Sequence, residues 1–289
     1  MDPSAWLRFL APYQFSYLAV VSTAVVLILY LRGLRAARAR GEHISAGRRI
    51  AFLLGLALCY AVLHTRIDYY AQYVFFIHRL QHLVLHHAGP FLIALSVPWP
   101  VLALGLPDGL RERWLRPAWQ HAALQIPYRF VQHPVVAPIL FVGLIYFWLT
   151  PEIHFDAMLS LTLYHVMNWS MLIDGLLFWW LMLNPRPAGP VAALSFGLRI
   201  LILFLIMLPQ IGLGAYIALS GTDLYDVYAV CGRAWPIDPA TDQQLGGLFT
   251  WIPAAMMSVL GILLVIRFMM RHEKQIGETG KEARELPSP

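Results

Sequence analysis

Long apolar segments separated by short polar stretches dominate the chain. Seven of them hold at least about 17 residues, enough for a helix to cross the roughly 30 Å hydrocarbon core of a bilayer. They cover residues 13–32, 50–66, 71–97, 134–150, 157–183, 191–219 and 246–268. None shows the strict alternation of a barrel strand. The pattern therefore predicts an all-α integral membrane protein built as a seven-transmembrane-helix bundle.

We expect a single transmembrane domain over residues 1–271. The polar tail, residues 272–289, ends in Pro-Ser-Pro and is predicted to be disordered. Composition supports a membrane protein, because 59% of the residues are hydrophobic and only 13% are charged. A soluble domain carries about 25% charged residues. The mean hydropathy of +0.61 points the same way.

The positive charges are concentrated in alternate loops. Sixteen Arg and Lys residues fall in one set of loops and in the tail, whereas the other set holds only Arg8, Arg66 and Arg233. The positive-inside rule therefore predicts a periplasmic N-terminus and a cytoplasmic C-terminus, and an odd number of spans agrees with termini on opposite sides. This topology explains the net charge of +5 without a nucleic-acid partner. The basic loops are expected to contact anionic membrane lipid.

The longest cytoplasmic connection covers residues 105–133. It mixes Trp114, Trp119 and Phe130 with several arginines. This composition fits either a plain amphipathic connector or a helix that lies in the plane of the membrane interface.

Four histidines interrupt the apolar stretch FIHRLQHLVLHHAG, residues 76–89. His78, His82 and His86 are spaced four residues apart and therefore lie along one side of the third span, whereas His87 points about 100° away. Ionisable groups in a membrane span are costly and mark functional sites. Two interpretations stay open. The histidines bind a metal or haem, or they are hydrogen-bonded residues in the bundle interior.

Further potential ligands are predicted at a similar depth. His64 ends the second span and His165 lies in the fifth, so both join His78, His82 and His86 as candidate metal ligands. Four additional ligands are considered: His87, His154, Met171 and Cys59. Neutral imidazole, thioether and thiolate together suit copper, especially Cu(I). Haem held by two histidines is the alternative cofactor.

The remaining charges near the spans suggest structural roles. Asp174 and Arg199 lie at matching depths of adjacent antiparallel spans and are predicted to form an ion pair that fixes the bundle, with a proton path as the alternative. Asp242 stands where it would cap the last span. Arg79 is expected to pair with an external carboxylate such as Asp68, or to extend toward the outer surface.

Several chemical signatures are absent from the sequence. It contains no Walker-type loop, no CxxC or CxxCH motif, no Ser-His-Asp set at one depth and no potassium-channel filter. We therefore predict that the protein is not an enzyme.

Three blocks of sequence resemble the multi-span CtaG family of cytochrome c oxidase assembly factors. The first is HRLQHLVLHHAGPFLIAL, residues 78–95; the second combines residues 133–158 and 175–183; the third is DQQLGGLFTWIP, residues 242–253. The third block is the most specific, because Asp-Gln-Gln-Leu followed by Gly-Gly and Trp-Ile-Pro is an unusual opening for a helix. Together the blocks cover most of residues 70–265.

The resemblance carries over His78 and His82 from the first block. From the third block it carries over Asp242, Gln243 and Trp251. The fifth span departs from the family pattern, in which a His-containing motif is expected shortly before GLLFWW. Here the stretch reads YHVMNWSMLIDG, and His165 is its only histidine.

The resemblance implies a multi-pass protein of the bacterial inner membrane that assists assembly of a haem–copper (cytochrome c) oxidase, at the copper-loading stage. It implies that oxidase subunits are partners. A periplasmic protein that donates copper is a further expected partner. We expect copper to pass His64 and His154 and to be held by His78 and His82, with help from His165 or a methionine. It would then be passed to an oxidase subunit docked against the bundle. A bis-His haem redox protein and a metal-free scaffold for oxidase subunits are the alternatives. A small-solute transporter fits less well, because no inverted repeat is visible.

Overall fold

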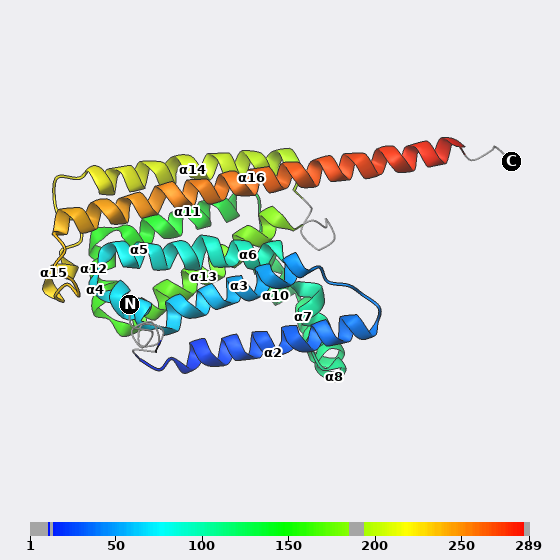
Figure 1. The fold of residues 1–289 in the computed structure, drawn as a ribbon, viewed down its shortest axis with the longest axis horizontal. Coiled ribbons are helices and arrows are strands. Elements are labelled where there is room, and N and C mark those ends of the chain that lie inside the picture. Colours follow the sequence, from blue (N-terminus) through cyan, green and yellow to red (C-terminus); the bar gives the residue numbers. More distant parts are fainter. Residues whose placement is uncertain (1–10, 12–13, 185–193, 286–289) are drawn as a thin grey trace.

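The chain folds into a bundle of helices, most of which run along the long axis of the molecule (Figure 1). The computed structural model describes residues 11, 14–184 and 194–285, and within these ranges there is no β-strand. Five helices are long and apolar enough to cross a membrane, and two bent helix pairs raise the number to seven if each pair is one span. The predicted all-α, multi-pass architecture is confirmed, with five to seven candidate spans. The orientation of the termini stays a prediction.

The five long helices agree with five of the predicted spans. They are α2 (Tyr17–Ala39), α3 (Ala46–His64), α13 (Leu161–Leu183), α14 (Phe196–Leu219) and α16 (Pro239–Glu285). The predicted spans 13–32 and 191–219 each begin on residues outside the described ranges. Two short helices accompany the spans at one end of the bundle: α4 (Arg66–Tyr73) and α12 (Pro151–Leu159). The single turn α15 (Val227–Val230) lies at the same end (Figure 1).

The third predicted span is a helix with a wider turn in its middle. It consists of α5 (Phe75–Leu83), the π-helical turn η1 (Val84–Ala88) and α6 (Gly89–Leu95). A π turn adds a residue to the helical repeat, and such turns are frequent at functional sites. The turn changes which side chains share a face, and two of the predicted histidines lie within it.

The third span ends at a sharp bend that a neighbouring helix stabilises. The chain turns by 75° into α7 (Trp99–Gly105). The last carbonyls of a helix lack helical partners. Here Arg48 of α3 donates hydrogen bonds to the carbonyls of Ser96 (2.7 Å) and Val97 (2.8 Å). Val97 itself has a positive φ of 49°.

The connection over residues 105–133 is largely helical. It contains α8 (Asp108–Leu110), the π turn η2 (Arg111–Leu115), α9 (Arg116–Gln120) and α10 (Ala122–Val131), and α10 meets α11 (Val136–Leu149) at 72°. Trp114, Trp119 and Phe130 are exposed on it. Exposed aromatic side chains among arginines suit a membrane interface. Contact with lipid headgroups stays a prediction.

The last helix is longer than the sequence pattern indicates. α16 continues to Glu285, well past the predicted end of the span at residue 268, and projects beyond the bundle (Figure 1). We expected a disordered tail from residue 272. The described part of this tail is helical instead, and Lys274 pairs with Glu278 one turn later at 3.7 Å. Such pairs support an exposed helix weakly. Residues 286–289 lie outside the described ranges.

Candidate functional site

The polar side chains of the third span point into the bundle. All six are buried: His78, Arg79, Gln81, His82, His86 and His87. A buried polar group in a membrane protein must find its partners within the protein, because hydrocarbon offers none. The partners that these side chains find divide the histidines into two clusters.

The first histidine cluster consists of His78, His82 and His154. The ring centroid of His78 lies 4.3 Å from that of His82 and 5.0 Å from that of His154. His78 Nδ1 is 3.3 Å from the carbonyl oxygen of Ala71, so this nitrogen carries the proton and donates. The other nitrogen, Nε2, is buried without a hydrogen-bond partner. His78 therefore presents a free lone pair inside the protein.

His154 is held by hydrogen bonds at both ring nitrogens. Its Nδ1 donates to the carbonyl of Trp148 at 3.0 Å, and its Nε2 accepts from the hydroxyl of Tyr228 at 3.0 Å. Burial lowers the pKa of His154 to about 3, so the ring is neutral. His154 was predicted as an additional ligand, and the structure brings it beside His78 but leaves it no free lone pair.

His82 is likewise engaged at both nitrogens. Nδ1 lies 3.1 Å from the guanidinium nitrogen Nη1 of Arg79, which can only donate, so Nδ1 accepts. Nε2 lies 3.1 Å from the amide oxygen of Asn168 and therefore donates. Metal binding by His82 would require one of these bonds to break.

Arg79 is a buried cation whose partners are neutral. Besides His82, its Nε donates to the hydroxyl of Thr250 at 3.0 Å. No ion pair in the described part of the chain involves it. The expected partner Asp68 accepts hydrogen bonds from Gln81 and Tyr164, each at 2.8 Å. Burial raises the pKa of Asp68. The predicted pairing of Arg79 with Asp68 is therefore replaced by polar contacts inside the bundle.

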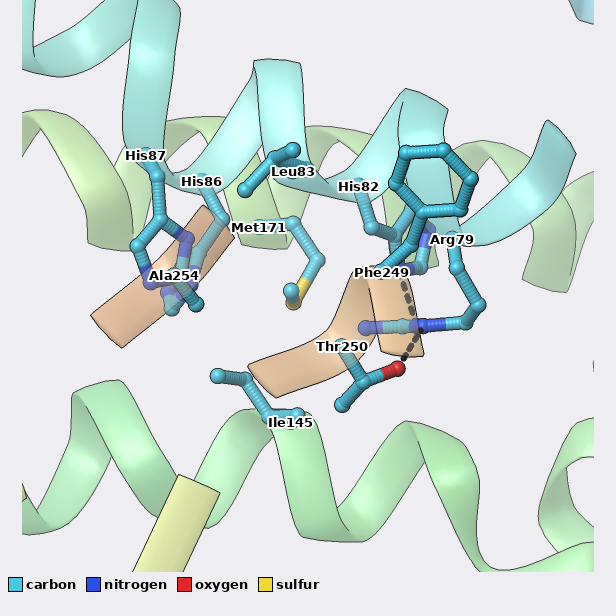
Figure 2. A pocket seen from close by; sticks show the side chains of 10 residues that line it. All are labelled: Arg79, His82, Leu83, His86, His87, Ile145, Met171, Phe249, Thr250 and Ala254. Atoms are coloured by element: carbon cyan, nitrogen blue, oxygen red, sulfur yellow. Dashed lines mark hydrogen bonds between the residues drawn. The ribbon is translucent and has the colours of Figure 1, made fainter. Parts of the chain in front are cut away.

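The second histidine cluster consists of His86 and His87, both within the π turn η1. Their ring centroids are 5.1 Å apart, and His86 stacks on Phe141 at 4.0 Å. Both line a small cavity with Met171 of α13, and His82 and Arg79 lie on its other side (Figure 2). The volume of this cavity is about 10 Å³. This is room for about one water molecule or ion.

Each histidine of the second cluster has one nitrogen held and one free. His86 Nε2 lies 2.9 Å from a carboxylate oxygen of Asp174, and His87 Nε2 lies 3.3 Å from the amide oxygen of Gln210. Both oxygens are acceptors, so both Nε2 atoms carry the proton. The Nδ1 atoms of both rings are buried without partners. The helical spacing predicts that His87 points about 100° away from the other three histidines, whereas in the structure its ring lines the same cavity as that of His86.

Three of the predicted ligands are placed elsewhere. His165 is exposed on α13, whereas His64 ends α3 and accepts a hydrogen bond from the backbone of Ser16 at 3.3 Å. Cys59 packs against Gly89. A Cβ atom added to Gly89 would lie 2.3 Å from the sulfur of Cys59. In the described residues no three His, Cys, Asp or Glu side chains converge as a metal site. The five-histidine ligand set expected from the sequence is therefore not assembled.

The predicted ion pair between Asp174 and Arg199 is also replaced. Asp174 is paired with His86. Arg199 donates to the carbonyls of Asn184 (2.7 Å) and Met182 (3.3 Å) at the end of α13, and to that of Leu194 (3.1 Å). Carbonyls at a helix end have no partner within the helix, so they compete with Asp174 for the guanidinium of Arg199. Matching depth alone did not reveal this competition.

Asp242 caps a different helix from the one expected. Its carboxylate accepts the backbone N–H of Phe75 (3.1 Å) and of Phe76 (2.9 Å), the first residues of α5, and it pairs with Arg233. Val74, which precedes α5, offers no side-chain cap. The start of α16 thereby fixes the start of the histidine-bearing span.

The rest of the 242–253 block joins the last two spans. Gln243 accepts from the backbone of Leu224 (2.7 Å) and donates to the carbonyls of Ile217 and Thr222. Trp251 packs on Gly214, where an added Cβ would lie 2.7 Å from the Trp251 Cβ. These contacts explain the unusual helix opening structurally.

Sequence reasoning missed the partners that set the histidine tautomers. These partners are all buried. Asn168 bonds to His82, Gln210 bonds to His87, and Thr250 accepts from Arg79. The available signal was the same one that drew attention to the histidines, namely a polar side chain within an apolar span.

The fold and the buried polar site define a multi-pass helical membrane protein whose third span carries two histidine clusters. A family model described as cytochrome c oxidase caa3 assembly factor (Caa3_CtaG) matches residues 28–272. The chain therefore belongs to this family, and the resemblance seen in the sequence is confirmed. The family's description is that of an assembly factor for cytochrome c oxidase.

The curated relatives are uncharacterised mycobacterial proteins. Those of Mycobacterium bovis and Mycobacterium tuberculosis are each 29% identical over 288 residues, which covers 95% of this chain and 42% of theirs. A Mycobacterium leprae protein is 28% identical over 293 residues, again 95% of this chain and 42% of its own. This chain thus spans about two fifths of their length. No solved structure matches it.

Proposed function

We propose that the protein binds copper inside its bundle and transfers it to a cytochrome c oxidase subunit during assembly, in the bacterial inner membrane and from the periplasmic side. One observation carries the proposal. His78, His86 and His87 each have one ring nitrogen held by a hydrogen-bond acceptor and the other buried with a free lone pair. Buried polar atoms are nearly always paired, so three such atoms in one span call for a ligand.

The donor set favours copper over other metals. Neutral imidazole and thioether are soft ligands that suit Cu(I), whereas magnesium and calcium require several oxygen ligands. The nearest carboxylate, Asp174, is already bound to His86. The cavity beside His86 and His87 has room for about one small ion, which favours a single metal over a porphyrin.

Hydrogen bonds that hold one ring nitrogen and leave the other free are typical of metal-binding histidines. A ligating imidazole usually donates its other N–H to a carboxylate or a carbonyl, which fixes the tautomer and the ring orientation. His86 has this arrangement with Asp174, and His78 has it with the carbonyl of Ala71. The proposed partners are an oxidase subunit that receives copper and a periplasmic donor that supplies it.

We expect the purified protein from copper-replete cells to carry copper. Changing the three histidines with free lone pairs together (His78→Gln, His86→Gln, His87→Gln) should abolish the bound copper, since no free buried imidazole would remain in the span. Metal analysis of both proteins, with thermal unfolding to check that the variant folds, measures this. The exposed His165→Ala variant is the control and should retain copper.

Oxidase assembly supplies the second readout. Cells that lack the protein should make oxidase deficient in copper, and added copper should partly restore its activity. If the protein carries no copper and its loss leaves the copper content of the oxidase normal, copper transfer is excluded. Loss of oxidase activity in that case would indicate the metal-free scaffold, and a Soret band in the purified protein would indicate the bis-His haem alternative.

A further inference from the structure

We propose that copper is bound as Cu(I) by Nδ1 of His86, Nδ1 of His87 and the thioether of Met171. This inference rests on the proposed copper function and gives it a specific site. It differs from the sequence-based choice of His78 and His82, and it places the metal in the π turn of the third span.

The three donors line one cavity. His86 and His87 enter it from η1, and Met171 enters from α13, with its sulfur between the histidines and Arg79 in the close view (Figure 2). Neighbouring residues of an ordinary α-helix point about 100° apart. Here both residues lie in the π turn over Val84–Ala88, and both rings line the cavity.

The close approach of α13 also supports the site. Gly175 lies directly against the turn, because an added Cβ would stand 2.5 Å from the carbonyl oxygen of His86. This contact sets the distance between α13 and η1. It therefore positions both Asp174, the residue before Gly175, and Met171, one turn earlier, against the histidines.

Hydrogen bonds prepare both rings for binding through Nδ1. Asp174 holds the Nε2 proton of His86, and Gln210 holds that of His87. Each Nδ1 atom is left as a buried acceptor without a partner. Leaving a buried acceptor unsatisfied costs free energy. A metal ion in the cavity satisfies both atoms at once.

The charges around the cavity favour a monovalent ion. Arg79 lines the same cavity and is paired with no carboxylate in the described part of the chain. Its positive charge opposes any bound cation, and a divalent ion is opposed twice as strongly as a monovalent one. Asp174, paired with His86, offsets one positive charge. The site thus selects Cu(I) over Zn(II) or Cu(II), and the nearby guanidinium favours release to a partner.

The first histidine cluster is less suited to the metal. Both nitrogens of His82 and both nitrogens of His154 already have hydrogen-bond partners. Only His78 offers a lone pair there. One free nitrogen does not make a copper site, whereas the second cluster supplies two nitrogens and a sulfur.

The test uses the full-length protein in detergent, loaded with Cu(I) under anaerobic conditions. X-ray absorption at the copper edge reports the ligand atoms, and competition with a coloured Cu(I) chelator reports the affinity. We expect nitrogen and sulfur scatterers in the wild type. Met171→Leu keeps the packing and should remove the sulfur scatterer. Asp174→Asn should lower the affinity about 10- to 100-fold, the usual effect of removing a partner of a ligating histidine.

Two matched controls make the result specific. Met167 is buried one turn before Met171 on the same helix but does not line the cavity, so Met167→Leu should retain the sulfur scatterer. His78→Gln should retain the copper. If His78→Gln loses copper while Met171→Leu is unchanged, the site assigned here is wrong and the proposed function stands. If the wild type binds no Cu(I), the proposed function itself fails.

Discussion

Replacing Asp242 near the start of α16 with alanine is expected to destabilise the protein strongly. The carboxylate is fully buried, accepts two backbone N–H groups at the start of α5 and pairs with Arg233. Its removal leaves two helix donors unsatisfied and a largely buried guanidinium without its main partner. Breaking such a pair costs about 3–5 kcal/mol. The expected result is a strongly lowered melting temperature in detergent and a loss of oxidase activity in membranes.

A nearby aspartate provides the control for the Asp242→Ala experiment. Asp226 lies in the connection between α14 and α16, is exposed and makes no side-chain cap to α15. Asp226→Ala removes the same charge and should melt like the wild type. Asp242→Asn keeps an oxygen acceptor but loses the charge opposite Arg233. Its melting temperature should therefore lie between those of Asp242→Ala and the wild type. Equal melting temperatures for Asp242→Ala and the wild type would contradict the capping role.

The second large effect is expected at the crossing of the last two spans. Gly214→Ala places a methyl group 2.7 Å from the Cβ of Trp251 and 2.8 Å from the carbonyl oxygen of Gly247. Neither contact can be relieved by rotating a flexible side chain, so α14 and α16 must move apart. Overpacking of this kind costs about 1–3 kcal/mol. Because α16 holds both the start of α5 and Arg79, the variant should also reduce oxidase assembly.

The same helix supplies a matched substitution for Gly214→Ala. An added Cβ at Gly212 meets nothing within 4 Å. Gly212→Ala should therefore be neutral or stabilising, since alanine favours a helix over glycine by about 1 kcal/mol. Melting curves and membrane oxidase activity of the two variants, measured side by side, test the prediction. A Gly214→Ala protein as stable as Gly212→Ala would show that the close approach does not limit the packing.

The two effects concern one structural unit. α16 fixes α5 through Asp242, holds Arg79 through Thr250 and packs on α14 through Gly247 and Gly214. The family-specific block at residues 242–253 thus positions the third span, where the histidines lie. Of this block, only Phe249 and Thr250 line the cavity beside His86 and His87. Its other residues affect the proposed copper site through the position of the third span.

The all-helical membrane fold was readable from the sequence because it depends on local composition. A stretch of apolar residues long enough to cross hydrocarbon must satisfy its backbone within itself, and only a helix does so. The family was readable for a similar reason, since short blocks such as DQQLGGLFTWIP carry it without reference to the fold. The importance of His78, His82, His86 and His87 as buried polar residues followed from the same reasoning.

Which residues meet one another was decided by the tertiary structure. Helical periodicity assumes an ordinary α-helix, so it could not foresee the π turn at His86 and His87 or the single cavity that both rings line. Depth in the membrane does not specify helix order, so it could not show that Asp174 would pair with His86 while Arg199 bound carbonyls.

The availability of each imidazole nitrogen depends still more on the fold. His82 and His86 look equivalent in the sequence, spaced four residues apart on one span. In the structure both nitrogens of His82 are occupied, whereas Nδ1 of His86 is free. Composition and spacing determined that this protein is a helical membrane bundle with buried histidines. Only the packing of distant side chains, Asn168, Asp174 and Gln210, decided which lone pairs are left for a ligand, because hydrogen bonds between helices are set by their contacts in space.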